Sequence, residues 1–79
     1  MAKKKATKDW EQAIQHVLRA ARVERGATQR QLSKLLGKSA NVINLIETGN
    51  RDCSLGEFLQ ICELIGAEPC DIISRIVRW

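Results

Sequence analysis

The stretch from Thr28 to Thr48, TQRQLSKLLGKSANVINLIET, constrains the fold of this chain more than any other part of it. Thr28 and Gln31 have the spacing of a capping box, in which two side chains satisfy the first free N–H groups of a helix. Gly37 stands directly after the leucines of that helix, where a left-handed backbone commonly ends a helix. Ser39 can then cap a second helix. The stretch therefore predicts two short helices joined by a tight turn.

Each of these two helices has an apolar side and a polar side. The apolar positions have helical spacing and are Leu32, Leu35 and Leu36 in the first helix and Ile43 and Ile46 in the second. Asn41 and Asn44 lie on another part of the second helix's surface. Two helices joined by a turn of three or four residues, the second rich in short hydrogen-bonding side chains, are typical of a helix-turn-helix that binds DNA.

In such a unit, the first turn of the second helix, the recognition helix, contacts base edges in the major groove. An asparagine can form two hydrogen bonds with adenine, and a small methyl group can lie against the methyl of thymine. These chemistries favour direct contacts to bases from Ala40, Asn41 and Asn44. Lys38 and Ser39 come just before them and could reach a phosphate or a base.

The stretch and its flanks resemble the Cro/C1-type (lambda-repressor-like, XRE) family of helix-turn-helix regulators. The resemblance rests on an ordered set of positions: Gly26, Thr28, Gln29, Leu32, Gly37, Ser39, Ile43, Ile46, Glu47, Gly49, Ser54 and Leu55. It weakens before Ile14 and after Ile73, so it covers roughly three-quarters of the chain. It implies an all-α, five-helix domain that binds double-stranded DNA and regulates transcription.

The resemblance also implies which residues contact the DNA backbone. Gln29 corresponds to the family's phosphate-anchoring glutamine, at a helix N-terminus that itself attracts anions. The loop after the recognition helix touches the backbone in this family. The candidates for backbone contacts are therefore Gln29, Arg30, Thr48, Asn50 and Arg51.

The family pattern further implies a structural ion pair between Arg22 and Glu47, which would tie the preceding helix to the recognition helix. Five positions depart from the pattern, namely Ala27, Ser33, Lys38, Leu45 and Cys53. Ser33 stands where alanine is usual at a close helix–helix contact, and it is small enough to fit. Leu45 stands where a polar residue is usual on the recognition helix, so it could pack against a thymine methyl or meet a protein partner.

Three further helices are expected around this pair. Their start signals are Asp9 with Gln12, Ser54 with Glu57, and Pro69 at a first helical position. The expected apolar faces are Trp10, Ile14, Val17, Leu18 and Ala21 in the first, Leu55, Phe58, Leu59, Cys62 and Ile65 in the second, and Ile72, Ile73, Ile76, Val77 and Trp79 in the last. The first of these helices should stop near Arg25 and Gly26, and the second at Gly66.

The last helix carries more apolar surface than a small monomer is expected to cover. Ile72 can complete the core, whereas Ile73, Ile76, Val77 and Trp79 need further cover. A two-fold contact between two copies would bury them and would set two recognition helices about 34 Å apart, one turn of DNA. The alternative is that these residues fold back onto the first helix.

Charge is divided unevenly along the chain. Residues 1–51 hold 11 Lys and Arg against 4 Asp and Glu, a net +7, and residues 52–79 hold 2 against 5, a net −3, which gives the total of +4. The positive part coincides with the helix-turn-helix, as expected for a polyanion-binding face. Residues 1–8 contain four lysines and are expected to form a flexible basic arm that contacts DNA or serves only as a solubilising tail. Residues 9–79 are expected to form one domain.

Other chemistries find little support. Cys53, Cys62 and Cys70 are odd in number and lack CxxC spacing, so we expect buried or half-buried thiols and no disulfide framework. His16, expected to be solvated, is the only histidine, which makes a metal site improbable. There is no glycine-rich phosphate loop, and we expect neither an enzyme nor a cofactor. No apolar run is long enough to span a membrane and no export signal is present, so we expect a cytoplasmic protein.

The favoured hypothesis is a homodimeric repressor or controller that reads a palindromic operator in the major groove with residues 39–48. The alternative is an antitoxin, or another protein-binding module of the same fold, with a toxin or other protein as its partner. Leu45 and the apolar last helix are the features that favour this alternative.

Overall fold

The computed structural model describes residues 9–79, which form five helices and no strand. The helices are α1 (Trp10–Glu24), α2 (Gln29–Leu36), α3 (Val42–Glu47), α4 (Leu55–Ile65) and α5 (Pro69–Arg78). The prediction of an all-α, five-helix domain is therefore confirmed. The basic arm, residues 1–8, lies outside the described residues.

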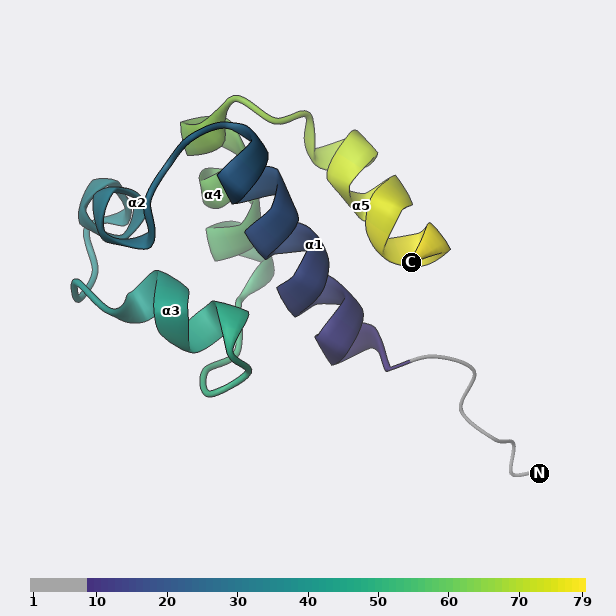
Figure 1. Ribbon diagram of the computed structural model, residues 1–79, viewed down its shortest axis with the longest axis horizontal. Helices are drawn as coiled ribbons and strands as arrows, with labels where there is room; N and C mark the ends of the chain where they lie inside the picture. The colour runs from purple at the N-terminus through teal and green to yellow at the C-terminus, as the bar shows by residue number, and fades with distance from the viewer. Residues whose placement is uncertain (1–8) are drawn as a thin grey trace.

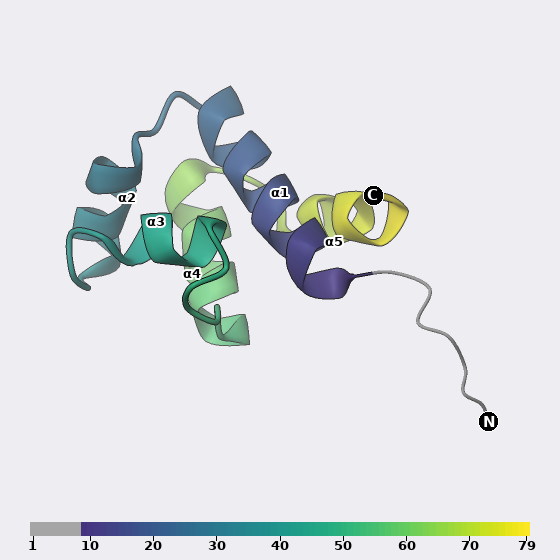
Figure 2. The same cartoon turned by 60° about the horizontal axis from the view of Figure 1, so that its bottom comes forward.

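The longest helix, α1, separates two parts of the molecule (Figures 1 and 2). On one side lie α2 and α3, which pack against each other, with α3 also packing against α1. On the other side lies α5, which packs against α1. Helix α4 lies behind α1 in Figure 1 and packs against both α2 and α5. This arrangement leaves α3 and the turn before it at one end of the molecule, far from most of α5.

The helix boundaries follow the local signals of the sequence. Thr28 and Ser54 each form a capping box, and the hydroxyl of each accepts from a backbone N–H three residues on, at 3.0 and 3.1 Å. Asp9 caps α1 in the same way, and Pro69 occupies the first turn of α5. Gly37, with φ of +77°, ends α2 in the left-handed conformation that favours glycine.

The core is formed by one face of every helix. Its buried apolar residues are Ala13, Val17, Leu18, Ala21, Leu32, Leu36, Val42, Ile43, Ile46, Phe58, Ile61, Cys62, Ile65, Ala67, Ile72 and Ile76. Ile72 is only 1% exposed and completes this core, as predicted. The apolar faces expected from the sequence did not include Val42 and Ile61, although both are buried.

Several predicted core residues are instead exposed. Leu35 of α2 and Leu55 of α4 are largely exposed, and Leu59 of α4 and Trp10 of α1 are about half exposed. The reason is that these helices carry apolar residues over more of their circumference than faces the core. In α4 the buried face runs through Phe58, Ile61, Cys62 and Ile65, and the leucines fall beside it.

Helix α5 divides its apolar residues between the core and the surface. Ile76 is buried in the monomer, so the expectation that it needs cover from a second copy is wrong. Ile73, Val77 and Trp79 remain about half exposed, as expected. The ring of Trp79 lies 5.2 Å from that of the exposed His16 on α1, which brings the end of the chain back to the first helix.

The three cysteines are free thiols in three different environments. Cys62 is buried and Cys53 is half-buried, and burial raises the pKa of both thiols, that of Cys53 to about 11. These two thiols are therefore protonated at neutral pH and poor nucleophiles. Cys70 is exposed, contrary to the expectation of a buried or half-buried thiol. Within residues 9–79, no helix is long and apolar enough to cross a membrane, and no group of three or more acidic, histidine or cysteine side chains could hold a metal ion.

Candidate nucleic-acid interface

One of the first backbone N–H groups of α3 is satisfied by a neighbouring helix, while that of Val42 donates to the carbonyl of Ser39 at 3.1 Å. The hydroxyl of Ser33, a fully buried residue of α2, accepts a hydrogen bond from the backbone N–H of Ile43 at 3.1 Å. Ser39 does not cap α3, contrary to the expectation from the sequence: α3 begins only at Val42, and Asn41 at its N-cap position makes no side-chain capping bond. Ser33 therefore does more than fit a close contact, since it anchors the start of α3 to α2.

The predicted base-contacting residues before α3 face solvent. All five residues of the turn between α2 and α3 are exposed, namely Gly37, Lys38, Ser39, Ala40 and Asn41. Because α3 begins at Val42, Ala40 and Asn41 lie in the turn entering the helix rather than in its first helical turn. Val42, Ile43 and Ile46 bury the opposite side of α3.

The end of α3 is tied to α1 by an ion pair. Nε and Nη2 of Arg22 donate to the two carboxylate oxygens of Glu47 at 2.7 and 3.1 Å. Nη1 of Arg22 donates to the backbone carbonyl of Ala27 at 2.8 Å. This geometry is the one that the family resemblance implied for Arg22 and Glu47.

Gln29, the candidate phosphate anchor, extends this network to Asn44. Its side-chain nitrogen donates to Oε1 of Glu47 at 2.9 Å, and its side-chain oxygen accepts from Nδ2 of Asn44 at 3.3 Å. Both Gln29 and Asn44 are half-buried. The side chain of the predicted phosphate contact, Gln29, is therefore hydrogen-bonded to that of a predicted base contact, Asn44. No pattern in the sequence pointed to this pairing.

The loop after α3 is held by its own polar side chains. The Thr48 hydroxyl donates to the carbonyl of Asn44 at 2.8 Å and accepts from Nδ2 of Asn50 at 2.9 Å. The backbone N–H of Asn50 donates to the carbonyl of Leu45 at 2.9 Å. Thr48 and Asn50, two of the five candidates for backbone contacts, are exposed, whereas Leu45 is half-buried.

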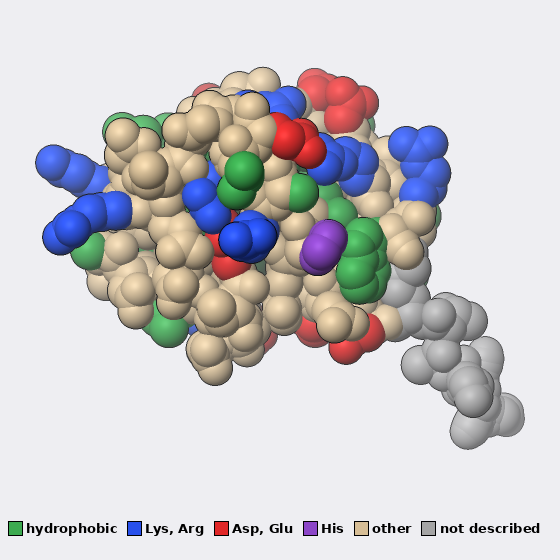
Figure 3. Space-filling view, viewed as in Figure 1, with side chains coloured by type: hydrophobic (Ala, Val, Ile, Leu, Met, Phe, Trp, Pro, Cys, Tyr) green, Lys and Arg blue, Asp and Glu red, His purple; other side chains and the backbone are tan. Residues whose placement is uncertain are grey.

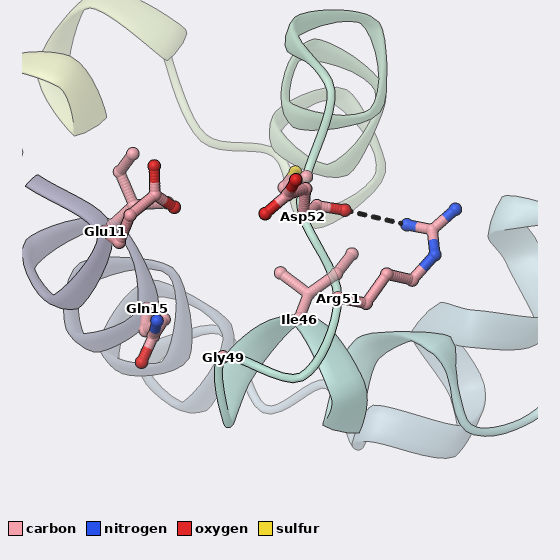
Figure 4. A pocket seen from close by; sticks show the side chains of 8 residues that line it. Glu11, Gln15, Ile46, Gly49, Arg51 and Asp52 are labelled. Atoms are coloured by element: carbon pink, nitrogen blue, oxygen red, sulfur yellow. Dashed lines mark hydrogen bonds between the residues drawn. The ribbon is translucent and has the colours of Figure 1, made fainter.

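Gly49 allows this loop to turn against α1. Its φ is +79°, and a Cβ at this position would lie 2.7 Å from the side-chain nitrogen of Gln15. A crevice of about 360 Å³ opens beside it, between the start of α1 and residues 49–53, with Glu11, Ile46 and Arg51 among its lining residues (Figure 4). The backbone conformation therefore favours glycine here, and a larger residue would also have to displace the end of the Gln15 side chain.

Arg51, the last candidate backbone contact, pairs with a buried carboxylate. Its two terminal nitrogens donate to the two oxygens of Glu57 at 2.9 and 2.8 Å, and Nζ of Lys38 lies 3.3 Å from the same carboxylate. The Arg51 guanidinium, the Ser54 backbone N–H and the Lys38 ammonium lower the pKa of Glu57 to about 2, and Glu57 in turn raises the pKa of Arg51. The sequence indicated only the capping role of Glu57.

Basic side chains project from the end of the molecule formed by α2 and α3 (Figure 3). Arg30 and Lys34 of α2 are both exposed there. One stretch of the chain, residues 30–51, contains these two cations, the exposed turn before α3 and the polar loop after it. A surface of this composition suits the phosphates and the base edges of a duplex.

Comparisons with known proteins agree with this description. A family model described as a helix-turn-helix domain matches residues 16–72. Two crystal structures of the clp gene regulator ClgR from Corynebacterium glutamicum are similar, with TM-scores of 0.79 and 0.81 and identities of 23% and 22%. They cover 89% and 91% of this chain and 91% and 77% of theirs.

The hypothetical transcription factor NHTF from Neisseria is similar in fold as well. It has a TM-score of 0.74 and 17% identity, over 91% of this chain and 83% of its own. None of the curated proteins matches this chain significantly. Because the family model spans well over half of the chain and includes both helices of the predicted pair, this protein belongs to the helix-turn-helix domain family.

Proposed function

We propose that this protein is a sequence-specific DNA-binding regulator of transcription. The observation that supports this most is the exposed turn from Lys38 to Asn41. It leads into a recognition helix that is held to α1 by the ion pair of Arg22 with Glu47 and to α2 by the hydroxyl of Ser33. A helix presented in this way can enter a major groove without losing its orientation. The similarity to ClgR and to NHTF, which are named as a gene regulator and a transcription factor, supports the same role.

In finer detail, the protein would act as a homodimeric repressor or controller in the cytoplasm, reading a palindromic operator with residues 39–48. Asn41 and Ala40 would contact bases, with Lys38, Ser39 and Asn44 beside them. Gln29, Arg30, Thr48, Asn50 and Arg51 would contact phosphates. The exposed apolar residues of α5, Ile73, Val77 and Trp79, would form the two-fold contact between the subunits.

The experiment is selection of bound duplexes from a random DNA pool, with wild-type protein, two test variants and one control variant. Asn41→Ala should relax the preference at one base position in each half-site, at a cost of about 1–3 kcal/mol, because it removes a pair of hydrogen bonds to one base. Gln29→Ala should weaken binding to all sequences, because phosphates carry no sequence information, and any change of base preference should be confined to the base that Asn44 contacts, since Asn44 is hydrogen-bonded to Gln29. Gln60→Ala, on the exposed side of α4, is the control and should behave as wild type.

The alternative, an antitoxin or other protein-binding module, rests on the exposed apolar surface of α5 and on Leu45. Leu45 is half-buried, so it offers a partner less apolar surface than an exposed leucine would. If no sequence were enriched from the pool and Asn41→Ala changed nothing, the placement of the reading surface would be wrong. A protein partner would then be the better explanation.

A further inference from the structure

Glu57 contacts one residue before the recognition helix α3 and one residue after it. Lys38 precedes α3 by four positions (38 against 42), and Arg51 follows it by four (51 against 47). Glu57 lies at the start of α4 and binds both side chains, with contacts of 2.8 and 2.9 Å to Arg51 and 3.3 Å to Lys38. One carboxylate therefore gathers two cations that flank α3 in the sequence.

The carboxylate faces inward and the cations face outward. Glu57 is 8% exposed, whereas the side chains of Arg51 and Lys38 are 34% and 43% exposed. The backbone N–H of Ser54 adds a further hydrogen bond to Oε1 of Glu57 at 3.1 Å. A carboxylate with these donors stays ionised around neutral pH, so it holds both cations throughout that range.

Both cations keep donors for a further ligand. Arg51 has five N–H groups, and its hydrogen bonds to described residues use three of them, two to Glu57 and one to the carbonyl of Asp52. Lys38 has three N–H groups and one ionic partner among these residues. The formal charge of the group is +1 after Glu57 is counted. A phosphate oxygen can therefore be bound without displacing Glu57.

We propose that Glu57 is a positioning residue for DNA binding, which holds Lys38 and Arg51 as a paired phosphate site beside the recognition helix. The inference rests on the proposed function, since it assigns a second role to the same surface. A positioning role predicts that loss of the Glu57 charge weakens DNA binding, whereas simple repulsion between Glu57 and phosphates predicts that it strengthens DNA binding. Removing an acidic side chain near a polyanion-binding surface ordinarily strengthens binding, whereas removing a positioning carboxylate weakens it.

The test is Glu57→Gln, which keeps the side-chain length and the capping box, because glutamine serves at that position of the box. Glu63→Gln is the matched control, since it makes the same change of charge on the exposed side of the same helix. Binding to a mixed-sequence duplex is measured by fluorescence anisotropy between about 50 and 200 mM salt. Glu57→Gln should weaken binding about threefold to tenfold and reduce the slope of log K against log salt by about 1–2 per subunit, at 0.9 per phosphate. Glu63→Gln should bind as tightly as wild type or more tightly.

Two further measurements separate positioning from a loss of fold. Circular dichroism fixes a temperature at which both variants are fully folded, and binding is compared there. Glu57→Gln is also introduced into a Lys38→Gln/Arg51→Gln protein, where it should cause no further loss, because the cations it positions are gone. A full further loss in that background would overturn the proposal, as would wild-type affinity and slope in the single variant. If the wild-type protein bound no duplex even at low salt, the proposed function itself would fail.

Discussion

Nε of Arg22 lies 2.7 Å from Oε2 of Glu47, and the two side chains are only 9% and 3% exposed. The pair joins the last turn of α1 to the last residue of α3. Glu47 also accepts from Gln29, so its carboxylate is bound from two helices at once. The orientation of the recognition helix therefore depends on a buried charge whose partners all lie outside α3.

Removing that carboxylate should destabilise the whole fold. Glu47→Ala leaves the buried guanidinium of Arg22 without its ionic partner, and such changes cost about 3–5 kcal/mol. Urea unfolding measures this loss directly. Glu24→Ala is the control, because Glu24 pairs with Arg75 at the surface, where ion pairs contribute little. Equal free energies of unfolding for the two variants would contradict a structural role for the pair.

Glu57 should make the stability of the protein sensitive to acid. Its pKa is about 2 in the folded protein against an ordinary value of 4.5, so folding favours its ionised form. The resulting stabilisation is present above about pH 5 and is lost as the pH falls through 4.5 toward 2. Urea unfolding across this range should give a steeper decline for wild type than for Glu57→Gln. Parallel curves would show that Glu57 does not contribute.

Two isoleucines of α5 should respond differently to the same substitution. Ile76 is buried, so Ile76→Asp places an unpaired carboxylate in the monomer core and should unfold or strongly destabilise the protein. Ile73 is 44% exposed and belongs to the proposed two-fold contact, so Ile73→Asp should leave a helical, folded chain that does not form the proposed dimer. Sedimentation velocity at micromolar concentration, with circular dichroism as the check of folding, separates these outcomes. Leu35→Asp, on the exposed side of α2, should remain dimeric, and a dimeric Ile73→Asp protein would move the interface elsewhere.

The basic arm should affect DNA affinity and not stability. Residues 1–8 carry four lysines and lie outside the described residues. Their deletion should weaken DNA binding and reduce its salt dependence, because the slope falls by about 0.9 for every phosphate that the protein no longer neutralises. The melting temperature of the domain should stay the same. A large fall in melting temperature on deletion would mean that the arm packs against the domain.

The sequence predicts best what is decided locally. Capping by Thr28 and Ser54 and the turn at Gly37 involve neighbours in the chain, and the structure has each of them as predicted. Ser39 shows the limit of such signals. It has a capping residue type and suitable spacing, but the hydroxyl that satisfies the start of α3 comes from Ser33 on another helix, and only the packing of α2 against α3 brings it there.

The polar pairings of the candidate site depend on packing in the same way. Gln29 and Asn44 are 15 positions apart, and their hydrogen bond requires a specific approach of α2 to α3. The pairing of Glu57 with Lys38 likewise requires α4 to lie beside the turn before α3. The pairing of Arg22 with Glu47 is predictable only because the resemblance to a known family supplies their positions. The exposed leucines of α4 have another cause. The apolar residues of α4 are compatible with more than one buried face, and only the packing of α4 against the other helices decides which face is buried.

The most direct test of the proposed DNA-binding role is the salt dependence of binding to duplex DNA. A dimer that neutralises about six to ten phosphates should show a slope of log K against log salt near −5 to −9, because each phosphate contributes about 0.9. Fluorescence anisotropy with wild-type protein between about 50 and 200 mM salt gives this slope. A slope in that range is the predicted result. A slope near zero, or no binding to any duplex pool at low salt, would contradict the assignment of the α2–α3 surface to DNA.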